Sequence, residues 1–201
     1  MLLAEVPFLR ARVAAIVGDD ARSIALTREA ETQQRRIGSR MSLGKCLILR
    51  AGGLMRAGDP AAAAASLREA AEIEASLGFD GEVRACRVRL ADALRCDGRL
   101  EEAKSLVEAE LPFLDEIGTL DTAWMPLAVR MAAWRVLVAA GDGRASRQLE
   151  LAMTELQRRV AKVADPAVRR RMLEGLPLHR EIVAEWHEHL GPAPKAITDH
   201  P

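Results

Sequence analysis

Apolar residues recur along this chain at the spacing of amphipathic helices. Near the middle they occupy every third or fourth position, on one face of a helix, at Leu100, Ala103, Val107, Leu111 and Leu114. The same periodicity continues through most of the sequence. It predicts helices, arranged in pairs, at residues 3–17 and 20–37, 40–57 and 60–77, 80–96 and 99–117, and 120–140 and 143–163.

Glycines mark the ends of these predicted helices at a nearly constant interval. Six follow one another every 20 residues and a seventh comes 23 residues later: Gly18, Gly38, Gly58, Gly78, Gly98, Gly118 and Gly141. Glycine adopts the left-handed conformation that ends a helix without a steric penalty. After Gly58, Asp59 and Pro60 are favourable first residues of a new helix. Two helices repeated every 40 residues indicate a helical solenoid.

The regular period changes near the third and fourth predicted pairs. There the interval stretches from 40 to 43 residues, and Pro112 and Pro126 flank the link between the pairs. Proline removes a backbone hydrogen bond and bends or ends a helix. We therefore expect irregular stacking at this junction.

The end of the chain does not continue the repeats. We divide the sequence into repeats at residues 1–164, capping helices at 165–190 and a flexible tail at 191–201. A repeat array needs a terminal element that covers its last apolar face. The predicted cap residues are Val168, Met172, Leu173, Ile182, Val183 and Trp186, and they are expected to cover Leu149, Met153, Leu156 and Val160.

Small and large apolar residues alternate within the repeats in a recognisable way. One unit combines Leu90, Ala91 and Leu94 with the run Gly98-Arg-Leu-Glu-Glu-Ala103. These residues resemble tetratricopeptide-type repeats in their longer form, found in bacterial multidomain signalling ATPases and in LuxR-type and nucleotide-cyclase-like transcriptional regulators. The resemblance implies an all-α, right-handed solenoid of about four antiparallel helix pairs with a C-terminal capping helix. The first pair matches poorly, because Arg10 and Thr27 stand where large apolar residues are common.

Composition narrows the range of functions. The net charge is zero at pH 7, which argues against direct binding of nucleic acid. No stretch approaches the roughly 18 apolar residues of a membrane span, and none has the form of a signal peptide. We therefore expect a cytoplasmic protein with no membrane partner. The three cysteines, Cys46, Cys86 and Cys96, are expected to be small buried thiols.

One run of residues resembles a phosphate-binding loop. It extends from Gly38 to Cys46, but five residues rather than four separate Gly38 from Gly44. A cysteine also stands where such loops have the Ser or Thr that holds magnesium. We interpret this run as a turn between two helices.

Histidines near the end of the chain suggest metal binding but do not support it. Residues two apart point to different sides of a helix, so His187 and His189 cannot bind one ion together. Glu185 and His189 share a face, yet two ligands do not make a zinc site. No catalytic set of residues is recognisable either, and we expect no metal site, no cofactor and no enzymatic activity.

Arginines supply the candidate binding site. Arg84, Arg87 and Arg95 share one face of the helix predicted at residues 80–96, and Arg130 aligns with Arg87 in the next unit. The family resemblance implies that such first helices line a concave groove, where arginines bind carboxylates in bidentate fashion. Trp134 is the candidate aromatic residue of this groove. The alternative interpretation is an ordinary solvated face on which the arginines pair with Glu82 and Asp92.

Two functional hypotheses follow. The first is a non-catalytic protein–protein interaction module, a scaffold or regulatory part of a bacterial signalling or transcription-regulatory system. Its partner would be a protein or a peptide segment, and a homo-oligomer is a further option that the sequence leaves open. The second is a helical-repeat domain that senses a small anionic effector in its concave groove.

Overall fold

The computed structural model describes residues 5–116 and 123–191, which form ten helices and no strand. The prediction of an all-α protein is therefore confirmed. Among the described residues, no helix has both the length and the apolar content that crossing a membrane requires. The helices are α1 (Val6–Val17), α2 (Asp20–Ile37), α3 (Arg40–Arg56), α4 (Pro60–Ser76), α5 (Asp80–Cys96), α6 (Leu100–Asp115), α7 (Pro126–Ala139), α8 (Ala145–Val160), α9 (Pro166–Gly175) and α10 (Pro177–His189).

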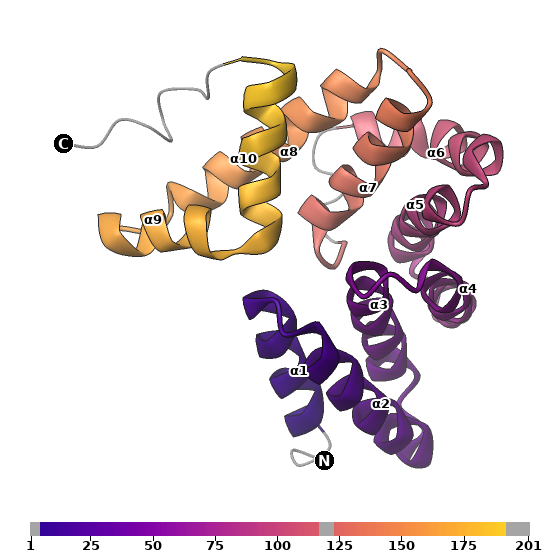
Figure 1. Cartoon of the computed structure of the whole chain (residues 1–201). Coiled ribbons are helices and arrows are strands. Elements are labelled where there is room, and N and C mark those ends of the chain that lie inside the picture. Colours follow the sequence, from indigo (N-terminus) through magenta and orange to yellow (C-terminus); the bar gives the residue numbers. More distant parts are fainter. Residues whose placement is uncertain (1–4, 117–122, 192–201) are drawn as a thin grey trace.

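Most helices that follow one another in the chain pack on one another, whereas α9 packs on α10 rather than on α8 (Figure 1). In Figure 1 the chain runs from α1 and α2 at the bottom, round by α4 and α6 at the right, to α8 and α9 at the upper left. The two ends of this arc approach each other. A Cβ atom added to Gly18 would lie 3.6 Å from Cγ of Pro177, so the end of α1 lies beside the start of α10.

The glycine turns have the geometry that the sequence predicts. Gly58 follows the end of α3 and has a φ of 79°. The side chain of the next residue, Asp59, accepts a hydrogen bond from the backbone N–H of Ala62 at 3.1 Å. The left-handed glycine ends one helix and the aspartate begins the next, so a turn needs few residues. The glycine predicted to do this at position 118 lies outside the described residues.

The junction before α7 differs from the others. The helix predicted at 120–140 begins only at Pro126: residues 123–125 form bends, and residues 120–122 lie outside the described part of the chain. Proline suits the first helical position and disfavours a helical residue before it, so it sets this boundary. Whereas α3 and α5 pack extensively on the helices before them, α7 packs more on α5 than on α6. The predicted irregular stacking is confirmed.

Helices α2, α3 and α4 meet through buried polar groups. On α2 the buried face carries Ser23, Thr27, Glu31 and Gln34. Glu31 accepts a 2.6 Å hydrogen bond from Arg50 of α3, whose guanidinium also donates to Ser66 of α4. Burial raises the pKa of Glu31 above its ordinary value, and the nearby Arg50 cation opposes this. This part of the core therefore contains buried ion pairs and hydrogen bonds as well as apolar packing.

Most of the residues predicted to form the cap pack on the cluster that contains the apolar residues of α8. Ile182 of α10 is fully buried, and the four α8 residues that it was expected to help cover are buried as well. Trp186 is half-buried against the same core. Val168 is an exception, since it is 39% exposed. In α9 no residue is fully buried, and the face that carries Met172 is the one that packs toward the core. The predicted tail lies outside the described residues, except Gly191.

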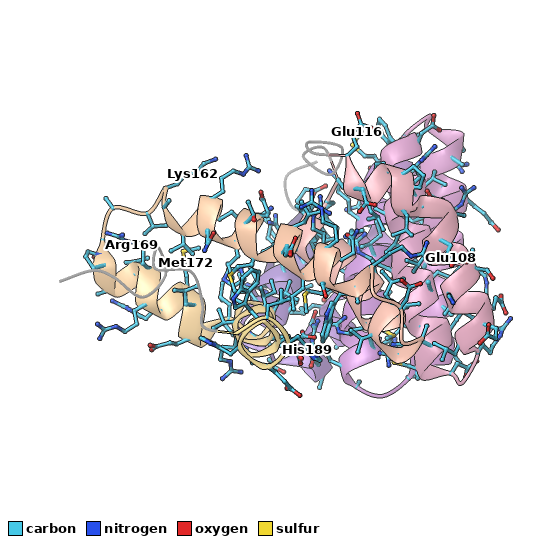
Figure 2. The ribbon with its side chains drawn as sticks, turned by 90° about the horizontal axis from the view of Figure 1, so that it is seen from above. Glu108, Glu116, Lys162, Arg169, Met172 and His189 are labelled. Atoms are coloured by element: carbon cyan, nitrogen blue, oxygen red, sulfur yellow. The ribbon has the colours of Figure 1, made fainter. Side chains whose placement is uncertain are left out.

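Figure 2, seen from above, shows the same arrangement. Met172 lies between α9 and the end of α8, whereas Lys162 points away from the cap into solvent. Within the cap it is thus α10, rather than α9, that closes the core.

Replacing Ile182 with alanine tests the cap. Ile182 of α10 is completely buried in the core that α10 shares with α8. We therefore expect Ile182→Ala to lower the free energy of unfolding by about 2–5 kcal/mol. Exposed Val168 provides the matched control, and Val168→Ala is expected to change stability by less than about 0.5 kcal/mol. Urea denaturation followed by circular dichroism measures both. Equal effects would show that α10 does not seal the array.

A buried histidine joins α9 to α10. His179 is enclosed at the start of α10, and its Nδ1 lies 3.0 Å from the carbonyl oxygen of Met172, so the neutral ring donates a hydrogen bond there. Burial lowers the pKa of His179 below its ordinary value of 6.5. The hydrogen bond to Met172 opposes this shift, and the Arg159 cation on α8 adds to it.

Because of this histidine, we expect the protein to lose stability in mild acid. When the pH falls below about 6.5, the unfolded chain binds a proton at His179 that the folded chain resists. The contribution of neutral His179 to stability is therefore fully present above that pH, and it declines as the pH falls toward the pKa of His179 in the folded protein. We expect the wild type to lose more stability than His179→Gln between pH 7.5 and 5.5 in urea denaturation. Carboxylates common to both proteins cancel in this comparison, and a constant difference at the two pH values would contradict it.

Candidate protein-binding surfaces

Two of the predicted groove arginines face α6. Arg87 donates a 3.2 Å hydrogen bond to one carboxylate oxygen of Glu110, and Arg84 lies 3.6 Å from the other. The guanidinium carbon of Arg84 also lies 5.5 Å from the ring centre of Phe113. Both arginines are about half exposed, but their charges are already shared with the buried Glu110.

The third arginine belongs to a network that links three helices. Arg95 binds Asp92 at 2.8 Å on α5, and the second oxygen of Asp92 accepts a hydrogen bond from Arg135 of α7 at 2.9 Å. Arg135 in turn forms a bidentate pair with Glu181 of α10, with distances of 2.8 and 2.7 Å. The sequence analysis missed Arg135 and Glu181, because only the packing of α10 on α7 brings them together.

Arg130 and Trp134 are buried, so the expectation that they line an exposed groove is wrong. Arg130 is 6% exposed and donates hydrogen bonds to the carbonyl oxygen of Leu114 at 2.7 Å and to Gln148 at 3.2 Å. Trp134 is 5% exposed and meets the ring of His189 edge-on at 5.6 Å. Both side chains are enclosed because α7 is surrounded by α5, α6, α8 and α10.

Substitution of two of these arginines distinguishes the buried from the exposed positions. Arg130→Gln removes a donor from two buried acceptors, and each unsatisfied acceptor costs about 1–3 kcal/mol. Arg87→Gln leaves Glu110 paired with Arg84 at a half-exposed site, so we expect a change within about 1 kcal/mol. Thermal and urea unfolding of the two variants measures the difference. Arg130→Gln with wild-type stability would show that the buried hydrogen bonds contribute nothing.

The bend before α7 lies against three other helices. Trp124 is half-buried, and its ring centre lies 5.9 Å from that of Phe8 of α1. It packs against two clusters of buried residues, one that includes Phe8 and one that includes Leu43 of α3 and Cys86 of α5. We call the side of α1, α3 and α5 that holds Trp124 the inner face. The prediction that Trp124 lies in a helix is wrong, and Pro126 was the signal that could have shown it.

Side chains of α5 hold the backbone of this bend. Glu82 accepts a hydrogen bond from the backbone N–H of Trp124, and Arg89 donates one to its carbonyl oxygen. Arg89 also reaches the carbonyl oxygen of Met125 at 3.4 Å. Burial lowers the pKa of the Arg89 guanidinium, although Cys86 and Glu82 favour its charge. Met125 itself has a φ of 62°, a left-handed conformation that is uncommon for a residue with a side chain.

The opposite side of α1 is apolar and uncovered. Five large apolar residues lie there at helical spacing, and the most exposed are Val13 at 61% and Val17 at 67%. We call this set the α1 stripe: Val6, Leu9, Val13, Ile16 and Val17. Part of the stripe borders an open hollow of about 300 Å³ between α1 and the start of α2, which is lined by Leu9, Arg10, Val13, Ala14, Val17, Asp19 and Arg22.

The run that resembles a phosphate-binding loop is a turn, as predicted. Gly38 ends α2 with a φ of 72°, and α3 begins at Arg40. Gly44 lies inside α3, where the carboxylate of Glu74 occupies the space that a Cβ atom would need. Its role in the structure is therefore to admit a buried carboxylate from α4.

The cysteines divide into two kinds. Cys46 and Cys86 are buried, and burial raises the pKa of each thiol to about 12, so these thiols carry no charge at neutral pH. Cys96 is exposed, so the prediction that all three are buried is wrong. It is the last residue of α5.

Three potential metal ligands share the surface of α10. Glu185, Glu188 and His189 place one ligand atom each within 4.8 Å of one another. The sequence analysis considered Glu185 with His189 and overlooked Glu188. His189 already pairs with Glu185 at 3.4 Å, and exposed acidic groups commonly gather in this way without a metal.

Comparison of the chain with family models, with curated proteins and with solved structures found no match. The surfaces described above therefore have to be interpreted from their own chemistry.

Proposed function

We propose that this protein is a non-catalytic protein–protein interaction module and that a partner binds the α1 stripe. The observation that carries the proposal is the exposure of five large apolar side chains on one face of one helix. Scattered apolar residues on a surface need no explanation, but a contiguous set at helical spacing is typical of a contact surface. Elsewhere on α1, Phe8, Ala11 and Ala14 are buried, so the helix uses its other face for the core.

Charge next to the stripe indicates the chemistry of the partner. Arg10 and Arg22 line the hollow, and the only acid there, Asp19, already accepts a hydrogen bond from the backbone N–H of Arg22. A surface with an apolar centre and cationic edges complements an amphipathic helix that carries carboxylates beside its apolar face. We therefore infer that the partner presents such a helix.

The wider setting rests on the sequence period. We interpret the chain as a right-handed tetratricopeptide-like solenoid of about four antiparallel helix pairs, capped by the helices after residue 164. The 40-residue interval and the short glycine turns support this interpretation. The family resemblance places the module in a bacterial signalling or transcription-regulatory system of the cytoplasm, with a protein or a second copy of the chain as partner.

The second hypothesis, a sensor for a small anionic effector, has less support. Arg84 and Arg87 pair with Glu110, and Arg95 pairs with Asp92. Arg130 donates its hydrogen bonds inside the core. An anion at these arginines would have to displace carboxylates of the protein itself, which makes the α1 stripe the better supported site.

A charge placed in the stripe tests the proposed function. Val13→Glu is expected to leave the melting temperature within a few degrees of wild type, because position 13 is solvent-exposed, and to abolish binding of the partner. Val138→Glu is the matched control, since Val138 of α7 is an exposed valine outside the stripe. In-cell crosslinking at position 17 identifies the partner, and fluorescence anisotropy with its contacting segment gives the affinity.

Three outcomes are informative. A partner that binds the wild type and Val138→Glu, but binds Val13→Glu at least tenfold more weakly, supports the proposal. Equal binding by all three proteins would contradict it. Sedimentation of the wild type as a dimer and of Val13→Glu as a monomer would instead assign the stripe to self-association.

A further inference from the structure

The bend at residues 123–125 is bound to the inner face as a separate peptide would be. Its single aromatic side chain enters an apolar site between α1 and α3, and its backbone N–H and C=O groups are held by two side chains of α5. Such contacts to the backbone do not depend on which side chains the bound segment carries. Specificity comes from the side chains, mainly from the large ring of Trp124, because the other buried side chain of the bend is the small Ala123.

We propose that the inner face is a recognition site for an extended peptide segment that carries a tryptophan. In the free protein, residues 123–125 of the same chain occupy this site. A segment of a partner protein displaces them and binds in their place. The site is distinct from the α1 stripe, since Phe8 points to the inner face whereas Leu9 and Val13 lie on the exposed side of the helix.

The two clamping side chains have unused hydrogen-bonding capacity. Among the described residues, Oε2 of Glu82 and Nη1 of Arg89 are buried and have no hydrogen-bond partner. Buried polar atoms are normally paired, so unpaired atoms beside a bound segment indicate places for further polar groups. A longer extended segment would offer one more N–H to Glu82 and one more C=O to Arg89. On its C-terminal side the internal segment turns into α7 at Pro126, which has no backbone N–H, and so supplies no further N–H there.

The backbone of the internal segment is also strained. Met125 adopts the left-handed conformation immediately before α7, with φ 62° and ψ 57°. Such a conformation persists only where surrounding contacts enforce it. Release of the segment from Glu82 and Arg89 would remove this strain. The free energy gained in this way would offset part of the contacts that the internal segment loses when an external segment replaces it.

Competition by the internal segment determines how the site is tested. A segment tethered to its own site has an effective concentration on the order of millimolar. An external peptide therefore binds the wild type only weakly, and removing the internal anchor should expose the site. The probe is the fluorescein-labelled peptide Thr-Ala-Trp-Met-Pro-Leu, which repeats the internal sequence, and the readout is fluorescence anisotropy.

We expect Trp124→Ala to bind this peptide at least tenfold more tightly than the wild type does. The same peptide with alanine in place of tryptophan should not bind. Trp186→Ala is the matched control, because it removes a tryptophan from the cap and leaves the inner face unchanged. In the Trp124→Ala protein, the additional change Arg89→Gln should weaken peptide binding about tenfold. A folded Trp124→Ala protein that binds no better than wild type would overturn the proposal.

A measurement on the wild type covers the case in which Trp124→Ala does not fold. The chain has three tryptophans, so incorporation of 5-fluorotryptophan gives three fluorine NMR signals. Peptide at several millimolar should move the Trp124 signal to its solvent-exposed position and leave the Trp134 and Trp186 signals unchanged. Failure of the Trp124 signal to move would reject exchange. A dimer formed by swapping residues 123–125 between copies would also overturn the assignment to a partner protein.

Discussion

The structure depends on the burial of α7. Apolar residues surround almost the whole circumference of this helix, and a helix of that kind is stable only when other elements cover it on all sides. Helices α5, α6, α8 and α10 provide this cover. Close packing of α7 on α5 places residues 123–125, which directly precede α7, against the inner face. The position of Trp124 and the burial of Arg130 and Trp134 both follow from this arrangement.

The two halves of the molecule are held together differently. In the C-terminal half, one large apolar cluster extends from α5 to α10 and includes Leu114, Met131, Leu149 and Ile182. In the N-terminal half, α2 meets α3 through Glu31 and Arg50, and the apolar clusters are small. Ion pairs in a protein interior offset their own desolvation only in part. The N-terminal half therefore relies on buried polar groups as well as on apolar packing, whereas the C-terminal half has one continuous apolar core.

These differences bear on how the molecule would bind partners. Helix α1 contributes one face to the core through Phe8 and leaves the other exposed at Val13 and Val17. The inner face, by contrast, is already covered by Trp124. One helix thus separates a surface that is open to a partner from a site that the chain occupies itself. Because Phe8 contacts Trp124 directly, a change in the position of α1 would alter both.

The sequence alone was sufficient to predict most of the helices and the glycine turns between them, although not the start of α7. Periodic apolar residues, together with glycines such as Gly58 and the capping Asp59, are local signals, and local signals determine where helices begin and end. The stacking irregularity near Pro112 and Pro126 and the burial of Ile182 were also predictable, because proline geometry and an apolar stripe act within a few residues.

Tertiary structure alone decided which of the candidate arginines are exposed. Arg87 and Arg130 occupy equivalent positions in the predicted repeat, yet Arg87 is half exposed and Arg130 is buried. The reason is that α7 packs on α5, α6, α8 and α10, which the repeat pattern does not predict. The pairing of Arg135 with Glu181 and the clamp of Glu82 and Arg89 on Trp124 join residues from distant parts of the chain. A repeat period contains no information about such contacts, since they depend on how successive helices are placed in space.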